Sequence, residues 1–215
     1  MKTEKKGPSG RPRGFDTGEA LERAMLVFWE YGYEGASLGR LTSAMGISAT
    51  SVYAAFGNKE ELFRKALERY TEGPSAYLDE ALKEPTSLGV ATAILSGVIR
   101  TTTAPARPQG CLGIQGALAA GESAQPAREL LVGWRNDGYL RIRERFERAV
   151  AEGDLSAGTD AGLVARYVTT LAHGIAVQAA SGVCRDELQA LVAGVLRGWP
   201  PLRGEGADSA GEPTR

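Results

Sequence analysis

The sequence predicts an all-α protein of about nine helices, with a small N-terminal part and a larger C-terminal bundle. Two observations support this prediction. Apolar residues recur at i, i+3, i+4 and i+7 over most of the chain, and neither an alternating strand pattern nor an internal repeat interrupts them. The length of 215 residues also suffices for one large or two small domains with a sizeable core.

The first helix follows a segment, residues 1–14, that is too rich in Lys, Arg, Gly and Pro to pack. We expect this segment to be a flexible basic arm. Asp16 can cap the helix, with Glu19 at the reciprocal position, and Gly32 can end it. The apolar face of this helix consists of Leu21, Ala24, Met25 and Phe28.

Two short helices joined by a tight turn are predicted in residues 37–57. Ser37 can cap the first, and Gly46 supplies the left-handed residue that ends it. Ser48 can cap the second, so the pair forms a helix-turn-helix. Small side chains in the first turn of the second helix would let its N-terminus enter the major groove of DNA, where free backbone N–H groups favour phosphate. These first-turn residues are Ser48, Ala49, Thr50 and Ser51.

The rest of the chain continues with helical spacing. A connecting helix is predicted over residues 59–82, capped by Asn58 with Glu61 at the reciprocal position. In the long helix predicted over residues 125–153, Gly133 and Gly138 favour a kink or break. Further helices are expected over residues 88–103, 111–120, 125–153, 161–182 and 186–197. The predicted division is a basic arm (1–14), a helix-turn-helix domain (15–58), a connecting helix (59–82), a C-terminal domain (83–203) and a disordered tail (204–215).

From about Arg13 to Tyr70 the sequence resembles the TetR/AcrR family of bacterial transcriptional regulators. The resemblance ends on residues 51–62, SVYAAFGNKEEL, which follow the family's Y-x-x-F-x-s-K-E-x-L signature. The chain departs from the family pattern at Leu41-Thr42, where an Ile-Ala pair is frequent, and at Ala55, where a bulkier residue is frequent. The earlier matching stretches are Tyr31-Gly32-Tyr33, Ser37-Leu38 and Met45-Gly46-Ile47-Ser48.

The resemblance implies a three-helix DNA-binding domain whose recognition helix is Ser48–Ala55, and a homodimer on approximately palindromic double-stranded DNA. It also implies that Tyr53 and Lys59 contact phosphates. Lys59 could be an ordinary surface lysine, but a cation in the first turn of a helix opposes the helix dipole, which favours a phosphate partner. The arm could either solubilise the chain or lie along DNA. The expected DNA contacts are Arg13, Ser37, Ser48, Ala49, Thr50, Ser51, Tyr53 and Lys59, with Phe56 in the core.

The C-terminal domain is implied by the resemblance to sense a ligand and to dimerise. An apolar pocket between helices would be lined by Trp134, Tyr139, Tyr167 and His173, although a single histidine could equally be a buried core residue. The last two helices are expected to form a four-helix interface through Ala165, Val168, Ala172, Leu191 and Val195, and core packing within one subunit would explain the same residues. The expected function is a repressor that a small, mostly apolar effector releases from its operator.

Two other kinds of function are alternatives to such a repressor. In the first, Cys111 senses oxidation, or a protein partner replaces the ligand; a small buried hydrophobic role is commoner for a cysteine with no cation or base beside it. The second is an enzyme, which is not predicted. One histidine and two cysteines leave no nucleophile with a base and no cluster of metal ligands, so we expect neither a metal nor a cofactor.

The charge distribution agrees with a DNA-binding end. The formal net charge of -1 conceals a local charge of +4 in residues 1–15 and of -5 in the other 200. The N-terminal residues lack the apolar stretch of a secretory signal, and no apolar run reaches the ~18 residues of a membrane span. With only two cysteines, the expected location is a reducing cytoplasm and no membrane partner is expected.

Overall fold

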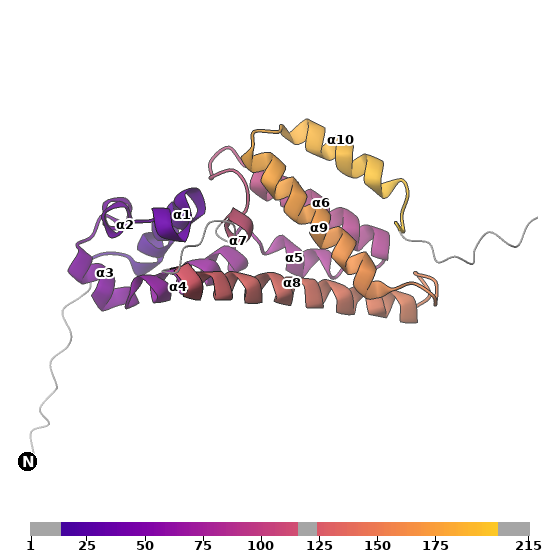
Figure 1. The fold of residues 1–215 in the computed structure, drawn as a ribbon, viewed down its shortest axis with the longest axis horizontal. Helices are drawn as coiled ribbons and strands as arrows, with labels where there is room; N and C mark the ends of the chain where they lie inside the picture. The colour runs from indigo at the N-terminus through magenta and orange to yellow at the C-terminus, as the bar shows by residue number, and fades with distance from the viewer. Residues whose placement is uncertain (1–13, 116–123, 202–215) are drawn as a thin grey trace, which may run out of the picture.

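The fold is all-α in the computed structural model, which describes residues 14–115 and 124–201; these residues contain no strand. The N-terminal helices α1, α2 and α3 gather at one end of the molecule, and α4 leads from them toward the rest (Figure 1). Their bounds are α1 Thr17–Gly35, α2 Leu38–Met45, α3 Ala49–Phe56 and α4 Lys59–Glu72.

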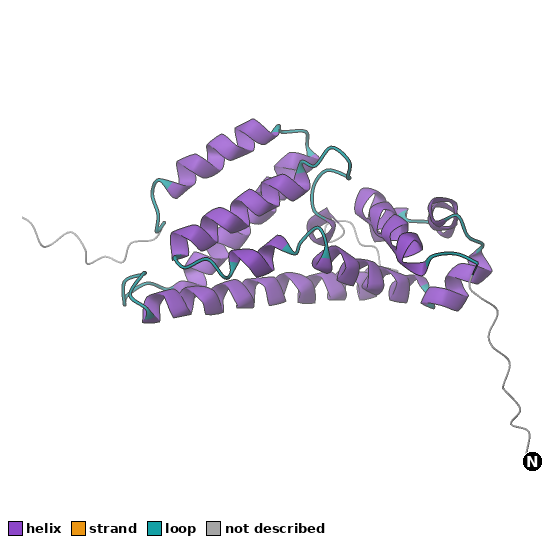
Figure 2. Ribbon diagram, turned by 180° about the vertical axis from the view of Figure 1, so that it is seen from behind, coloured by secondary structure: helices purple, strands orange, loops and turns teal. Residues whose placement is uncertain are grey.

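The C-terminal bundle is built on one long helix, α8 (Gln125–Ala151), which runs along one side of the molecule from α4 to the far end (Figures 1 and 2). Helix α9 packs against both α8 and α6, and α10 covers α6. The other helices are α5 Tyr77–Ala81, α6 Ser87–Thr102, α7 Leu112–Gln115, α9 Ala161–Ala180 and α10 Arg185–Leu196.

Two hydrophobic cores hold these helices together. The first is centred on the aromatic residues of α1 and α4, and it also contains Leu112 from α7 and both Ala127 and Leu131 from α8. The second lies between α6, α8, α9 and α10, around Phe146 and Val164. The core of the N-terminal domain is therefore completed by residues that come after α6. The aromatic members of the first core are Phe28, Trp29, Phe56, Phe63 and Tyr70.

The predicted helix starts are confirmed by the hydrogen bonds that cap them. Asp16 accepts from the backbone N–H groups of Gly18 and Glu19, while Ser37, Ser48 and Asn58 each accept from the backbone N–H three residues on. Gly46 ends α2 at φ 69°, as expected for a left-handed cap. At Gly32, also at positive φ, the chain leaves helical geometry before one further turn completes α1.

Two predictions about helices need correction, and a third lies partly outside the described residues. The single helix over residues 59–82 is wrong, because α4 ends at Glu72 and Pro74, which follows Gly73, lacks the N–H that would continue it; α5 is a separate short helix. The kink at Gly133 or Gly138 is also wrong, since α8 is continuous across both. Of the helix predicted over residues 111–120, α7 is the described part, and residues 116–123 lie outside the described chain, as do the arm and the tail beyond residue 201.

Candidate DNA-binding and ligand-binding sites

Helix α3, the predicted recognition helix, is fixed by two buried residues and presents its other face to solvent. Val52 and Phe56 are buried at 2% and 5% exposure, whereas Tyr53 is 51% exposed, as predicted. Thr50 is exposed in the first turn. The hydroxyl of Ser48 accepts from the backbone N–H of Ser51 at 3.2 Å, so this residue caps the helix whether or not it also contacts DNA.

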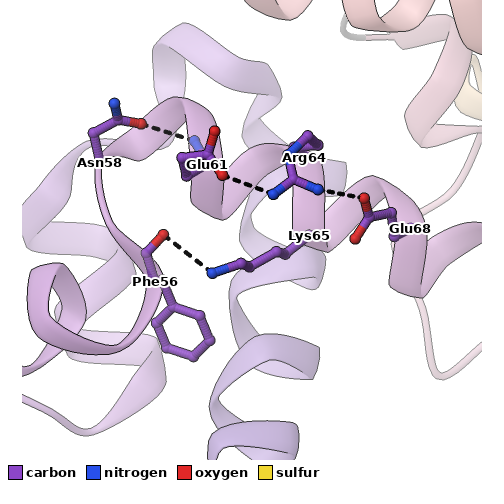
Figure 3. A network of polar contacts seen from close by, with 6 residues as sticks. All are labelled: Phe56, Asn58, Glu61, Arg64, Lys65 and Glu68. Atoms are coloured by element: carbon purple, nitrogen blue, oxygen red, sulfur yellow. Dashed lines mark hydrogen bonds and ion pairs between the residues drawn. The ribbon is translucent and has the colours of Figure 1, made fainter.

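The junction between α3 and α4 is held by polar contacts at the end of the recognition helix (Figure 3). Lys65 on α4 donates to the carbonyl oxygen of Phe56 at 3.4 Å and lies over the Phe56 ring. Asn58 caps α4, but the Glu61 carboxylate binds Arg64 instead of completing the reciprocal cap. Because α3 ends directly on α4, a displacement of α4 would carry the recognition helix with it.

Lys59 lies at the first position of α4, beside the end of α1. Its ammonium nitrogen is 4.6 Å from the centre of the Tyr33 ring, and burial lowers the pKa of the lysine while nearby Glu34 opposes that shift. The aromatic ring therefore supports a partly desolvated cation at a helix N-terminus, where an anion would be favoured.

Lys59→Ala is expected to weaken binding to operator and non-operator DNA alike. Each lost phosphate contact should flatten the dependence of log affinity on log salt by about 1, and hence by about 2 in a two-fold dimer. Fluorescence anisotropy at several salt concentrations measures this slope. Arg64→Ala is the matched control, since Arg64 is already paired with Glu61 and Glu68. If Lys59→Ala left the slope of log affinity against log salt unchanged, Lys59 would be a surface lysine without a phosphate contact.

A cavity of about 340 Å³ lies inside the bundle, between α4, α5, α6, α7, α8 and α9. Of the four residues expected at a ligand pocket, Trp134, Tyr139 and His173 line this cavity, whereas Tyr167 packs against the second core. Trp134 donates its indole N–H to the hydroxyl of Thr71 on α4 at 2.8 Å. The cavity thus touches the helix that leads to the DNA-binding end.

Cys111 also lines this cavity, although its sequence surroundings held no cation. The hydroxyl of Tyr70 donates to its sulfur at 3.2 Å. Burial raises the pKa of the thiol, while Tyr70 and the Arg135 guanidinium act in the opposite direction. The expectation that no cation accompanies Cys111 is wrong, because α8 brings Arg135 to it from a distant part of the sequence.

His173 is half-buried on α9, and its pKa is lowered by burial and by the positive charges of Arg135 and Arg166. As the chain has a single histidine, one imidazole titration curve in the proton NMR spectrum should show a midpoint below about 6.5. The unfolded chain then binds the proton more tightly, so the free energy of unfolding should fall as pH drops through about 6.5 toward the folded value. A titration midpoint of His173 at or above about 6.5 would show that burial and the two arginines do not lower its pKa.

Three comparisons place the chain among known proteins. Residues 20–66 match the model of bacterial regulatory proteins of the tetR family, and residues 91–190 match the Tetracyclin repressor-like C-terminal domain. The chain is 28% identical to the HTH-type transcriptional repressor ComR of Escherichia coli over 90% of this chain and 93% of ComR. It is 34% identical to the HTH-type transcriptional regulator YezE of Bacillus subtilis over 74% of this chain and 83% of YezE.

Among solved structures, a cysteine-substituted form of the TetR family regulator CifR, complexed with a 26-base-pair operator DNA, superimposes with a TM-score of 0.85. It is 41% identical, and the match covers 88% of this chain and all of the CifR chain. The chain belongs to the TetR family. It is a DNA-binding transcriptional regulator and not an enzyme, as the sequence predicted. None of the described helices is long and apolar enough to cross a membrane.

The sequence predicts a dimer interface on the last two helices, α9 and α10. Ala165 and Val168 have no exposed surface within the subunit, so they cannot contact a second copy and their prediction is wrong. Ala172 lines the cavity. Leu191 is 50% exposed and Val195 is partly exposed, which leaves both available. The exposed face of α9 instead carries Leu163, Thr170, Gly174 and Val177.

Proposed function

We propose that this TetR-family chain is a repressor that binds an approximately palindromic operator as a homodimer and is released by a small effector. The relatives support repression, since ComR is named a repressor and CifR was solved on operator DNA. The expected DNA contacts in the described residues are Ser37, Ser48, Ala49, Thr50, Ser51, Tyr53 and Lys59, and Arg13 lies outside them. A regulator of this kind acts in the cytoplasm, where the DNA is.

The observation that supports release by an effector is the direct contact between the cavity and α4. Tyr70 and Thr71 belong to α4 and line the cavity, where Cys111 and Trp134 are their hydrogen-bond partners. The loop next to Cys111 also reaches α1, because Trp29 donates to the carbonyl oxygen of Gly110 at 3.1 Å. A ligand that displaces these groups would move α4 and, through the junction with α3, the spacing of two recognition helices.

Dimerisation is proposed through the exposed faces of α9 and α10. Leu163 and Val177 are 50% and 44% exposed on α9, and Leu191 is 50% exposed on α10. Between the two apolar residues of α9, Thr170 and Gly174 are small enough to allow close helix approach. Two subunits joined in this way would place two recognition helices on half-sites about one turn of DNA apart, or somewhat more.

The test begins with selection of bound fragments from genomic DNA, which yields the operator. Operator affinity is then measured by anisotropy against a library of small, mostly apolar compounds. A coupling of ~1–3 kcal/mol would weaken binding by about 5- to 150-fold. Trp134→Phe, which lacks the N–H donated to Thr71, should reduce that response more than it reduces operator affinity. If no compound of the library changed operator affinity, release by a small apolar effector would be contradicted.

A second candidate is regulation by thiol oxidation at Cys111. Burial raises the pKa of this thiol and opposes oxidation, whereas the Tyr70 hydroxyl beside the sulfur and the Arg135 charge act in the opposite direction and favour the thiolate. Operator binding should then weaken on treatment with hydrogen peroxide and recover with dithiothreitol. Cys111→Ser removes that response but leaves the response to an effector. The exposed Cys184 makes Cys184→Ser the matched control.

A further inference from the structure

One cation of the cavity lacks a carboxylate partner in the described part of the chain. Four charged side chains other than histidine line the cavity. Asp79 and Arg141 form an ion pair with each other, and Asp137 is exposed to solvent. Arg135 is half-buried and donates to the carbonyl oxygen of Gly113 at 2.7 Å, but it belongs to none of the ion pairs between described residues. Its remaining N–H groups are available to an anion.

Arg135 and His173 line the same cavity, from α8 and α9 respectively. Besides burial, the positive charges of Arg135 and Arg166 also lower the pKa of His173. The guanidinium carbon of Arg166 lies 3.6 Å from the centre of the Tyr139 ring. No hydrogen bond between described residues includes the His173 imidazole. The two residues therefore present unused donors in a positive local field, which attracts an anionic group and repels a cationic one.

The rest of the cavity is suited to an apolar body. Its walls include Ile94 and Val98 from α6, Ile114 from α7, and both Trp134 and Ile142 from α8. A volume of about 340 Å³ is near the lower end of the ~300–1,000 Å³ that ligand pockets span, which limits the ligand to a small molecule.

We propose that this cavity binds a small monocarboxylate with an aromatic or branched aliphatic body, its carboxylate held by Arg135 and His173. The proposal rests on the proposed function only in treating the cavity as the effector site. The guanidinium of Arg135 matches a carboxylate in shape and charge, while His173 donates a second hydrogen bond that is stronger when the imidazole is protonated. Binding therefore raises the pKa of His173.

Matched pairs of probes test this class of ligand on the full chain. Benzoate and 3-phenylpropanoate should raise the thermal midpoint and bind measurably in calorimetry, whereas benzamide, 3-phenylpropanamide and benzylamine should bind at least tenfold more weakly. In the NMR titration, the two acids should raise the pKa of His173 and the amides should leave it in place.

Variants of Arg135 separate charge from packing. Arg135→Gln should lower the affinity for the acids by about 10- to 100-fold and leave the amides unaffected. Arg135→Lys keeps the charge and should keep the preference for acids, so it also serves if the glutamine variant is unstable. Arg148→Gln, on an exposed part of α8 outside the cavity, should change neither affinity.

The proposal is overturned if no acid of the panel binds, if amides or the amine bind as tightly as the acids, or if Arg135→Gln leaves acid affinity unchanged. These outcomes concern binding alone. Acids that bind in the expected way but leave operator affinity unaltered would support the ligand class and count against effector-driven release.

Discussion

Replacing Thr50 with glutamate is expected to abolish operator binding and leave the fold intact. Thr50 is exposed in the first turn of α3, and the helix is held by Val52 and Phe56 on its other face. A carboxylate at this position is favourable for the helix dipole, so the free chain should lose no stability. Against DNA the same charge meets phosphates, at a cost of several kcal/mol per site. Two sites per dimer should weaken operator affinity by more than about 100-fold.

Anisotropy with the selected operator, together with a circular dichroism melt, measures both halves of this expectation. Thr92→Glu introduces the same charge at an exposed position of α6 and should leave operator affinity unchanged. If the Thr50 variant bound the operator as tightly as the natural chain, α3 would not be the helix that enters the groove.

The second large effect is expected from Gly113→Ala, in α7. A β-carbon at this position would overlap the ring of Trp134, so the indole must move and its hydrogen bond to Thr71 must break. Overpacking of this kind costs about 1–3 kcal/mol and the lost hydrogen bond about 0.5–1.5 kcal/mol. The free energy of unfolding should therefore fall by roughly 2–4 kcal/mol in urea denaturation.

Gly133→Ala provides the matched control for this substitution. Gly133 lies within α8 and has open space around its α-carbon, so a methyl group should increase the free energy of unfolding by up to about 1 kcal/mol. An unfolding midpoint of Gly113→Ala equal to that of the natural chain would mean that Trp134 does not pack closely on α7.

Much of the DNA-binding end could be predicted because its determinants are local. Ser37, Ser48 and Asn58 cap helices through residues three positions away, and Gly46 needs only its own backbone freedom. The pattern does not predict the end of α4, although Gly73-Pro74 is a turn signal, because apolar residues continue at helical spacing beyond it. A periodic pattern does not reveal whether one helix or two carry it.

The cavity and the dimer surface were harder to predict because they depend on which helices meet. Trp134 and Ile142 lie eight residues apart on one face of α8, and that spacing also includes Gly138. Nothing local shows that Arg135 lines the same cavity as Cys111 and His173, which lie in other parts of the chain. Small apolar residues such as Ala165 and Val168 are equally suited to a core and to an interface, and only their burial in the folded subunit distinguishes the two.

The core shared between α1, α4, α7 and the start of α8 has a consequence for how such proteins can diversify. A fragment that ended at Glu72 would lose Leu112, Ala127 and Leu131 from its own interior. An exchange of DNA-binding ends between relatives would therefore join two surfaces that did not evolve together, unless residues 110–134 were transferred as well. The N-terminal helices and the start of the bundle can therefore be exchanged only together, because they share one interior.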